Sequence, residues 1–413
     1  MKYAMRYALC AMRFLNTAAP HPRVSSSVWP MLLMIGLLSS NCSEPAREAN
    51  WTGPARVALV APQTGALKDD GQMLQLGALT AIHEARLQTG NRKVEMVVYD
   101  SPCDAEGAAH VARRLAGDSS VFAVVGYLCA EALRAALPIY EEVDLALINP
   151  TVSAEYVRTR GRRHLFSLLY GDGEQAAFLA AYVKKGLGLS KVAVLNDGSA
   201  YGDLLMTSFL AEAERQGLEL AAKVAVTPDA AEVTRAVQLM KGVSPEAIFL
   251  AANANASSLF LLERRRQQLA GKVLGPDRLA DLDLYEMAGK AADGLLVCQP
   301  IILEKNGSEP QGFVRRFEMI HKRQPDWVAA VGYDAMRLAL GVLRRSGQKR
   351  AAFLQALQDI SGPDTSFAAL SGPIFFREDG TSQRPFFVAA IHGGRLRAAE
   401  PPSVEFAGPS DRN

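Results

Sequence analysis

The chain has 413 residues, which is too long for one ordinary hydrophobic core and suits two domains. Apolar residues make up 49% and charged residues 21%, the balance of a globular protein. The 45 Lys and Arg nearly cancel the 43 Asp and Glu, so the sequence implies no basic surface and excludes nucleic acid as the expected partner.

The N-terminal segment carries export signals. Basic residues precede the apolar run 28–38, whose length fits the core of a signal peptide better than a membrane span. The run ends in Ser-Ser-Asn-Cys, which is similar to a bacterial lipoprotein processing site and implies acylation of Cys42, although the asparagine departs from that pattern. We therefore expect a signal peptide over 1–41, a tether over 42–54, and a periplasmic protein held to the membrane by a lipid anchor. The alternative is an ordinary cleaved signal that leaves Cys42 as a free thiol.

Short apolar strands alternate with amphipathic helices along the rest of the chain. The strand-like runs are 57–61, 94–99, 121–126, 145–149, 191–196, 247–251 and 294–298. The helical patterns are 72–88, 104–116, 174–185, 203–216, 229–241, 256–269, 311–323 and 329–345. This alternation predicts an α/β fold with parallel sheets covered by helices on both faces. A fresh series starts near Lys191, which favours two doubly wound lobes, and the Pro- and Gly-containing segment 397–413 is expected to be disordered.

The cysteines are compatible with an exported protein. Cys103 opens a helix after one predicted strand, and Cys129 follows the next strand. Neighbouring parallel strands end side by side, so these two thiols could meet in an oxidising compartment, where a bridge would stabilise the lobe by roughly 3 kcal/mol. Cys298 is interpreted as a small buried apolar residue. No Cys or His pair has metal-ligand spacing, so neither a metal nor a cofactor is expected.

Motifs for catalysis are absent from the sequence. There is no P-loop and no dinucleotide fingerprint, and the run 198–202 places its serine one position too early for a nucleophile elbow. We therefore expect no catalytic residues, while an enzyme on an α/β scaffold stays open as an alternative. In such scaffolds ligands bind at the carboxyl ends of the strands, where helix N-termini present free N–H groups.

Several segments, in order, resemble the leucine/isoleucine/valine-binding protein family of branched-chain amino acid ABC transporters. These segments are 98–104, 124–129, 138–142, 147–151, 196–202, 274–277, 292–297 and 332–335. The resemblance covers roughly residues 55–395. It implies the type I periplasmic-binding fold, with two doubly wound parallel-sheet lobes joined by a three-stranded hinge, and a disulfide between Cys103 and Cys129.

The resemblance also implies where the chain passes between the lobes. We expect crossovers near Tyr170–Gly173, Cys298–Ile302 and Leu370–Pro373. The first lobe would then comprise 55–170 plus 300–371. The second lobe would comprise 171–299 plus 372–396.

The function that the resemblance implies is ligand binding without catalysis. The protein would close on a small solute, a branched-chain or related amino acid, and deliver it to a cognate membrane permease. A second hypothesis keeps the fold but gives it a bulkier apolar ligand such as a lipid, for transport or sensing.

Site residues can be carried over by position. The hydroxyls of Thr151 and Ser153 would bind the ligand carboxylate, Asp277 would hold its ammonium, and Tyr201 and Tyr333 would line the site. We expect Ser153 and Asp277 to face each other and to grip a zwitterion between them.

Other positions depart from the family pattern or allow a plainer interpretation. A carboxylate-binding serine is replaced by Ala130, and two expected aromatic residues are replaced by Asp70 and Asn253. Asp70 can be part of a polar loop. The other plain interpretations are a helix N-cap for Ser153, a turn or cap for Asp277, a surface residue for Tyr201 and a core residue for Tyr333.

Overall fold

The computed structural model describes residues 54–89, 94–101, 103–153, 155, 163–280, 282–304, 309–347 and 349–406. The expected signal peptide, Cys42 and all but the last residue of the expected tether lie outside these ranges. Within the described residues, no helix combines the length and the apolar composition that a membrane crossing needs.

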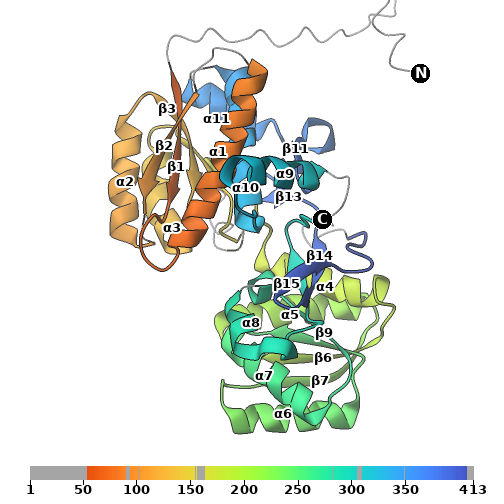
Figure 1. Ribbon diagram of the computed structural model, residues 1–413. Helices are drawn as coiled ribbons and strands as arrows, with labels where there is room; N and C mark the ends of the chain where they lie inside the picture. Colours follow the sequence, from red (N-terminus) through yellow and green to blue (C-terminus); the bar gives the residue numbers. More distant parts are fainter. Residues whose placement is uncertain are drawn as a thin grey trace, which may run out of the picture. The chain divides into compact units, whose positions relative to one another are not determined.

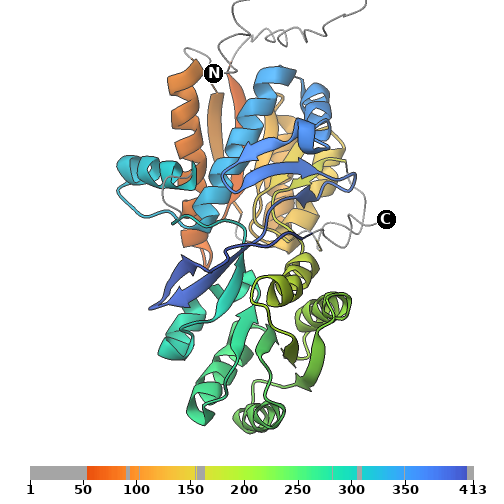
Figure 2. The same cartoon turned by 90° about the vertical axis from the view of Figure 1, so that its right-hand side faces the viewer.

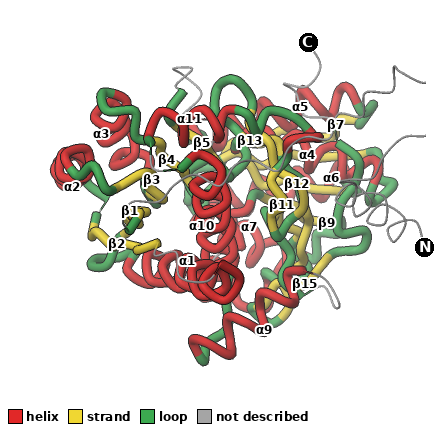
Figure 3. Tube along the Cα trace, turned by 90° about the horizontal axis from the view of Figure 1, so that it is seen from above, coloured by secondary structure: helices red, strands yellow, loops and turns green. Residues whose placement is uncertain are grey.

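The first lobe is built on a five-stranded parallel sheet in the order β2-β1-β3-β4-β5 (Figure 1). Its strands are β1 (Ala55–Ala61), β2 (Val94–Asp100), β3 (Val121–Gly126), β4 (Ala146–Asn149) and β5 (Leu165–Ser167). Its helices are α1 (Lys68–Thr89), α2 (Ala105–Gly117), α3 (Ala130–Glu141), α9 (Glu309–His321), α10 (Trp327–Ser346) and α11 (Arg350–Gln358). Helices α2 and α3 cover one face of the sheet, and α1 and α10 lie together on the other face (Figure 3).

Two glycines allow α1 and α10 to pack backbone against backbone. A Cβ atom on Gly77 would lie 1.9 Å from the Ala329 carbonyl oxygen, and one on Gly332 would lie 2.5 Å from the Leu74 carbonyl oxygen. Neither separation is possible for real atoms, so any larger residue would push the helices apart. Helix α10 is buried along most of its length and forms the centre of the first lobe's core.

The second lobe is built on a seven-stranded sheet in the order β15-β14-β10-β9-β8-β6-β7. Its strands are β6 (Lys191–Asn196), β7 (Glu219–Ala225), β8 (Ala247–Ala251), β9 (Lys272–Gly275), β10 (Leu296–Gln299), β14 (Phe387–His392) and β15 (Arg395–Ala398). The helices are α4 (Asp172–Lys185), α5 (Ala200–Arg215), α6 (Ala230–Val243), α7 (Ala254–Gln267) and α8 (Leu282–Ala288). The five strands from β10 to β7 are parallel, while β14 and β15 are antiparallel additions. The predicted fold class, two doubly wound lobes, is confirmed.

The third crossover lies later in the chain than expected. Strand β12 (Gly372–Phe376) joins β11 (Phe367–Ala369) and β13 (Ser382–Gln383) in a small sheet, drawn in blue in Figure 2. The Phe376 ring lies 5.1 Å from the Phe166 ring, centroid to centroid, inside the first lobe's core. The apolar side chains of β12 therefore hold it on the first lobe, and the chain crosses only at 384–386. The expected boundary at Leu370–Pro373 is wrong.

The three crossovers meet at one buried arginine. The first crossover begins just after Leu168, which packs in the first lobe's core, whereas Leu169 packs in the second. The Arg384 guanidinium donates 2.5 Å to the Leu168 carbonyl and 2.7 Å to the Pro300 carbonyl of the second crossover. It also donates 2.9 Å to the Ser371 hydroxyl. Arg384 is only 6% exposed, and burial lowers its pKa. A rigid fork with five donors suits such a junction better than any other side chain.

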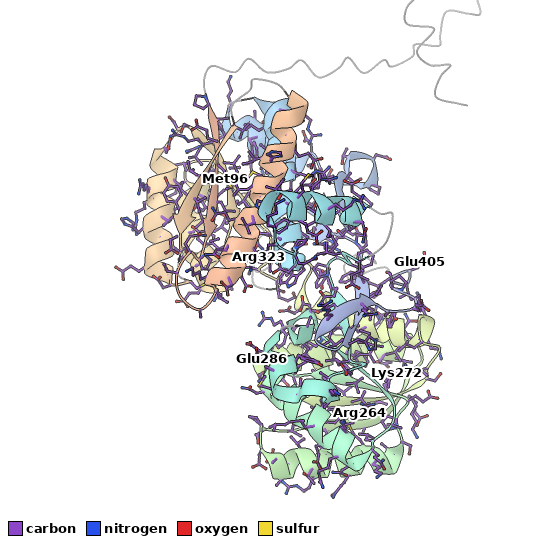
Figure 4. The ribbon with its side chains drawn as sticks, viewed as in Figure 1. Met96, Arg264, Lys272, Glu286, Arg323 and Glu405 are labelled. Atoms are coloured by element: carbon purple, nitrogen blue, oxygen red, sulfur yellow. A yellow bond between two sulfur atoms is a disulfide. The ribbon has the colours of Figure 1, made fainter. Side chains whose placement is uncertain are left out.

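The expectation of disorder from residue 397 is wrong for 397–406. Residues 397 and 398 complete β15, and the following segment lies against α4 of the second lobe. The Tyr182 hydroxyl donates 2.7 Å to the Pro401 carbonyl, and the Phe406 ring packs edge-on to Phe178 and Phe386. The carbonyl of Glu405, labelled in Figure 4, accepts 3.0 Å from the Lys185 ammonium. Aromatic packing outweighs the disorder that the prolines suggested.

The expected disulfide is present between Cys103 and Cys129, with their Cα atoms 5.4 Å apart. It closes a loop with a sequence separation of 26 residues. Cys298 is a buried free thiol, as the sequence suggested.

We predict that the double substitution Cys103→Ser and Cys129→Ser lowers the free energy of unfolding by about 3 kcal/mol, because the unfolded chain regains the freedom that the closed loop removes. Urea unfolding monitored by circular dichroism measures the loss. A reductant should lower the stability of the native protein by a similar amount and leave the double variant unchanged. A native protein that is indifferent to reductant would contradict the prediction.

Candidate ligand-binding site

Two of the predicted site positions, Thr151 and Ala130, lie at the strand ends of the first lobe. Half-buried Thr151 follows β4, and its hydroxyl donates 3.0 Å to the Tyr127 carbonyl just after β3. Ala130 is the first residue of α3, behind the disulfide-bonded Cys129. The strand-end location is thus as expected, but the Thr151 hydroxyl already has an acceptor within the protein.

Ser153 and Glu155 connect the loop after β4 to the first turn of α4. The Ser153 hydroxyl accepts 3.0 Å from the Asp172 backbone N–H and donates 3.0 Å to the Glu155 carboxylate. The other Glu155 oxygen accepts 2.9 Å from the Gly173 N–H. Two side chains of the first lobe therefore satisfy N–H groups that begin a helix of the second lobe. The N-cap residue of α4 is Gly171, so Ser153 is not the N-cap of the plainer interpretation, although its hydroxyl accepts an N–H of the first turn.

Asp172 and Asp277 form a carboxylate pair bridged by Gln175. The Gln175 amide donates 3.1 Å to Asp172 Oδ1 and 3.0 Å to Asp277 Oδ1, and its own oxygen accepts 2.9 Å from the Asp277 N–H. Asp172 is 3% exposed, and its Oδ2 has no hydrogen-bond partner among the described residues. A buried carboxylate oxygen left without a donor costs free energy, so it marks a place where a ligand donor would be favourable.

The electrostatics of the pair disfavour two full negative charges. Burial, followed by the neighbouring Asp277 and more weakly by Glu155, raises the pKa of Asp172, while Arg278 lowers it. Burial also raises the pKa of Asp277, against the lowering effect of its Gln175 hydrogen bond and of Arg278. A cation placed between the carboxylates would reverse both shifts, because it favours the charged forms.

Tyr201 lies next to this pair through Arg278. It stands in the first turn of α5, behind the N-cap Ser199, and the Arg278 guanidinium carbon lies 4.7 Å from the centre of its ring. Arg278 directly follows Asp277 in a short 3₁₀ helix (Asp277–Ala280). Tyr201 thus lies beside the residue that follows Asp277, and its role in lining the ligand site stays a prediction.

The structure places three other predicted residues apart from the pair. Tyr333 is fully buried in the first lobe's core, with its ring 4.8 Å from Phe313 and its hydroxyl donating to Glu84. Asn253 is exposed and caps α7 by accepting 3.1 Å from the Ala256 N–H. Tyr333 is thus the core residue of the plainer interpretation, and its assignment to the site lining is wrong.

Asp70 stands in the first turn of α1 and is half-buried. Burial, followed by Asp69 and by Asp283 of the second lobe, raises the pKa of Asp70. Among the described residues, neither Asp70 nor Asn253 is joined to the carboxylate pair by a hydrogen bond. The polar-loop interpretation of Asp70 is also inexact, since the residue belongs to the helix.

Sequence reasoning missed Asp172, Gln175 and Glu155. A signal for the first two exists in α4, where Asp-Gly-Glu-Gln precedes a run of eight residues that are all apolar. A helix that is apolar on every side is buried, so polar residues in its first turn must be buried too and need partners. Nothing in the sequence points to Glu155, because its role depends on the loop that brings it to α4.

A family model described as periplasmic binding protein matches residues 54–395. The chain belongs to this family. Within the part of the chain that the structure describes, no group of three or more His, Cys, Asp or Glu side chains is arranged to hold a metal ion.

The relatives of this periplasmic binding protein agree with the resemblance found in the sequence. The leucine-, isoleucine-, valine-, threonine- and alanine-binding protein of Pseudomonas aeruginosa is 25% identical over 253 residues, 61% of this chain and 68% of the relative. An ABC transporter substrate-binding protein of Desulfitobacterium hafniense, solved with Leu, superposes with a TM-score of 0.71 at 21% identity and covers 84% of this chain and 99% of its own. A branched-chain amino acid transporter substrate-binding protein of Streptococcus pneumoniae, solved with isoleucine, superposes with a TM-score of 0.68 at 21% identity, with the same two coverages.

We predict that Asp172→Asn raises the free energy of unfolding at pH 8 by about 1 kcal/mol or more, since one pKa unit corresponds to 1.36 kcal/mol. A carboxyl whose folded pKa exceeds its unfolded value loses stability as the pH rises above the unfolded value. The gain should therefore shrink as the pH falls toward 4. Urea titrations at several pH values measure it.

Glu286→Gln is the matched control for this titration. Glu286 is exposed on α8 and is labelled in Figure 4, so removing its charge should change stability little at any pH. A loss of stability in Asp172→Asn at pH 8 would show that the pair is not under electrostatic strain.

Proposed function

We propose that this protein is the ligand-binding component of an ABC-type uptake system and that it closes on a small amino-acid-like solute through the solute's ammonium group. The observation that carries the proposal is the Asp172–Asp277 pair, in which the buried Asp172 Oδ2 lacks a donor among the described residues. An ammonium supplies three N–H donors and one positive charge, which is what this pair lacks.

Contacts around the pair support closure on the ligand. Ser153 and Glu155 come from the first lobe, while Asp172, Gln175 and Asp277 belong to the second. A ligand that binds the pair and also touches first-lobe groups stabilises the closed arrangement over any arrangement in which those contacts are missing. The names of the relatives, which include leucine and isoleucine binders, favour a branched-chain or related amino acid.

The lipid alternative fits this site poorly. An apolar ligand against Asp172 would bury a carboxylate with no compensating donor, and such burial is strongly unfavourable. The family match supports a binding protein rather than an enzyme, and the proposal gives the pair no catalytic role.

We predict that at pH 8 at least one amino acid with an apolar side chain binds, and that Asp277→Asn weakens its binding at least tenfold because the ammonium loses a charged partner. Binding by the native protein should weaken from pH 8 to pH 5, since protonation of the pair removes the attraction. Isothermal titration calorimetry against the amino acids, with Glu286→Gln as the control, measures both effects. Binding of an uncharged lipid, indifferent to Asp277, in place of every amino acid would refute the proposal.

We further propose that Cys42 is acylated, which would hold the protein at the periplasmic side of a membrane beside its permease. Cys42→Ser should then move the protein from the membrane fraction to the soluble periplasmic fraction. Cell fractionation with intact-mass measurement decides the question. A native protein that is already soluble and carries no lipid mass would contradict the anchor.

A further inference from the structure

An amino acid site must bind both an ammonium group and a carboxylate, and this protein offers more partners for the first than for the second. For the ammonium group, Gln175 bridges the carboxylates of Asp172 and Asp277, and the buried Asp172 Oδ2 lacks a donor within the described part of the chain. The carboxylate end requires donors, and a hydroxyl has only one proton to give. The partners of each first-lobe hydroxyl therefore decide what that end can accept.

The two hydroxyls that the resemblance assigns to a ligand carboxylate, those of Thr151 and Ser153, are both engaged as donors within the protein. Thr151 donates to the Tyr127 carbonyl and Ser153 donates to Glu155. Position 130, at the start of α3, is an alanine with no hydroxyl at all. The backbone N–H groups of the first turn of α3 are donors that a neutral carbonyl oxygen can also accept, and Glu131 already places an acidic group in that turn.

Glu155 occupies the place that a ligand carboxylate would need. Its oxygens accept from the Ser153 hydroxyl at 3.0 Å and from the Gly173 N–H at 2.9 Å, a hydroxyl and a helix-terminal N–H. These are the two kinds of donor that recognise a carboxylate. A second carboxylate brought to Ser153 would have to displace Glu155 or bear its repulsion at close range.

The charge balance of the site points the same way. Asp277 and Glu155 both act on Asp172, and Arg278 acts on both aspartates. Glu174, the remaining carboxylate in this turn, forms an ion pair with Arg377 at 3.3 Å. A net cation therefore suits this cluster better than a zwitterion, whose carboxylate would bring a further negative charge beside it.

From these contacts we propose that the preferred ligand is an amine whose carboxyl group is absent or neutral, such as an α-amino amide, and that Glu155 is the residue that discriminates against the free acid. This inference rests on the proposed function and narrows its ligand class. The ammonium binds at Asp172 and Asp277. The amide oxygen can accept the N–H groups at the start of α3 without bringing a second negative charge beside Glu155.

Calorimetric titration of the mature protein at pH 7 with L-leucine and L-leucinamide, and with L-valine and L-valinamide, tests this directly. We expect each amide to bind at least tenfold more tightly than its acid. Glu155→Gln keeps an acceptor for the Gly173 N–H while removing the charge, so it should reduce the amide-to-acid ratio of affinities at least fivefold. A purely structural role for Glu155 would weaken both ligands alike and leave the ratio as it was.

The outcomes separate this inference from the proposed function. An acid that binds as tightly as its amide, or more tightly, overturns the preference for amides while leaving amine recognition intact. If neither acid nor amide binds, the proposed function fails, and this inference fails with it. Should Glu155→Gln prove unfolded by circular dichroism, the amide-to-acid ratio of the native protein alone decides.

Discussion

A single buried guanidinium holds together the three places where the chain passes between its lobes. Arg384 lies in the last crossover and donates to carbonyls at the first two, so the crossovers have a common fixed point. Burial makes each of these hydrogen bonds stronger than it would be in water and makes loss of any partner costly. The Leu168 carbonyl that accepts from Arg384 lies four residues before Asp172, and the position of the carboxylate pair therefore depends on this junction.

The candidate ligand site directly follows the Arg384 junction along the chain. Residues 168–171 lead into α4, whose first turn receives Ser153 and Glu155 from the loop after β4. The protein satisfies the N–H groups of that turn with its own side chains while leaving one oxygen of Asp172 without a donor. The start of α4 is thus well satisfied by hydrogen bonds, whereas the Asp172–Asp277 pair carries electrostatic strain. Such strain is common at functional sites.

Much of the fold could be predicted from the sequence because it depends on local patterns. Apolar runs located most of the parallel strands, although they missed β5, β7 and β9. The adjacency of strand ends made the Cys103–Cys129 bridge reasonable before the resemblance implied it. The third crossover could not be predicted, since β12 stays on the first lobe through contacts between Phe376 and the distant Phe166. Tyr333 was misassigned for a similar reason. Its surroundings, Phe313 and Glu84, come from two other helices.

The ordered C-terminal segment has a consequence for how the boundaries of such proteins are drawn. The family match ends at residue 395, the first residue of β15, whereas the second lobe continues to Phe406. A chain ended at the family limit would remove the edge strand and would uncover the rings of Phe178 and Phe386, which stack 5.0 Å apart beneath Phe406. Such a truncation would expose a patch of aromatic side chains and an unpaired edge strand. Both features promote self-association of folded proteins.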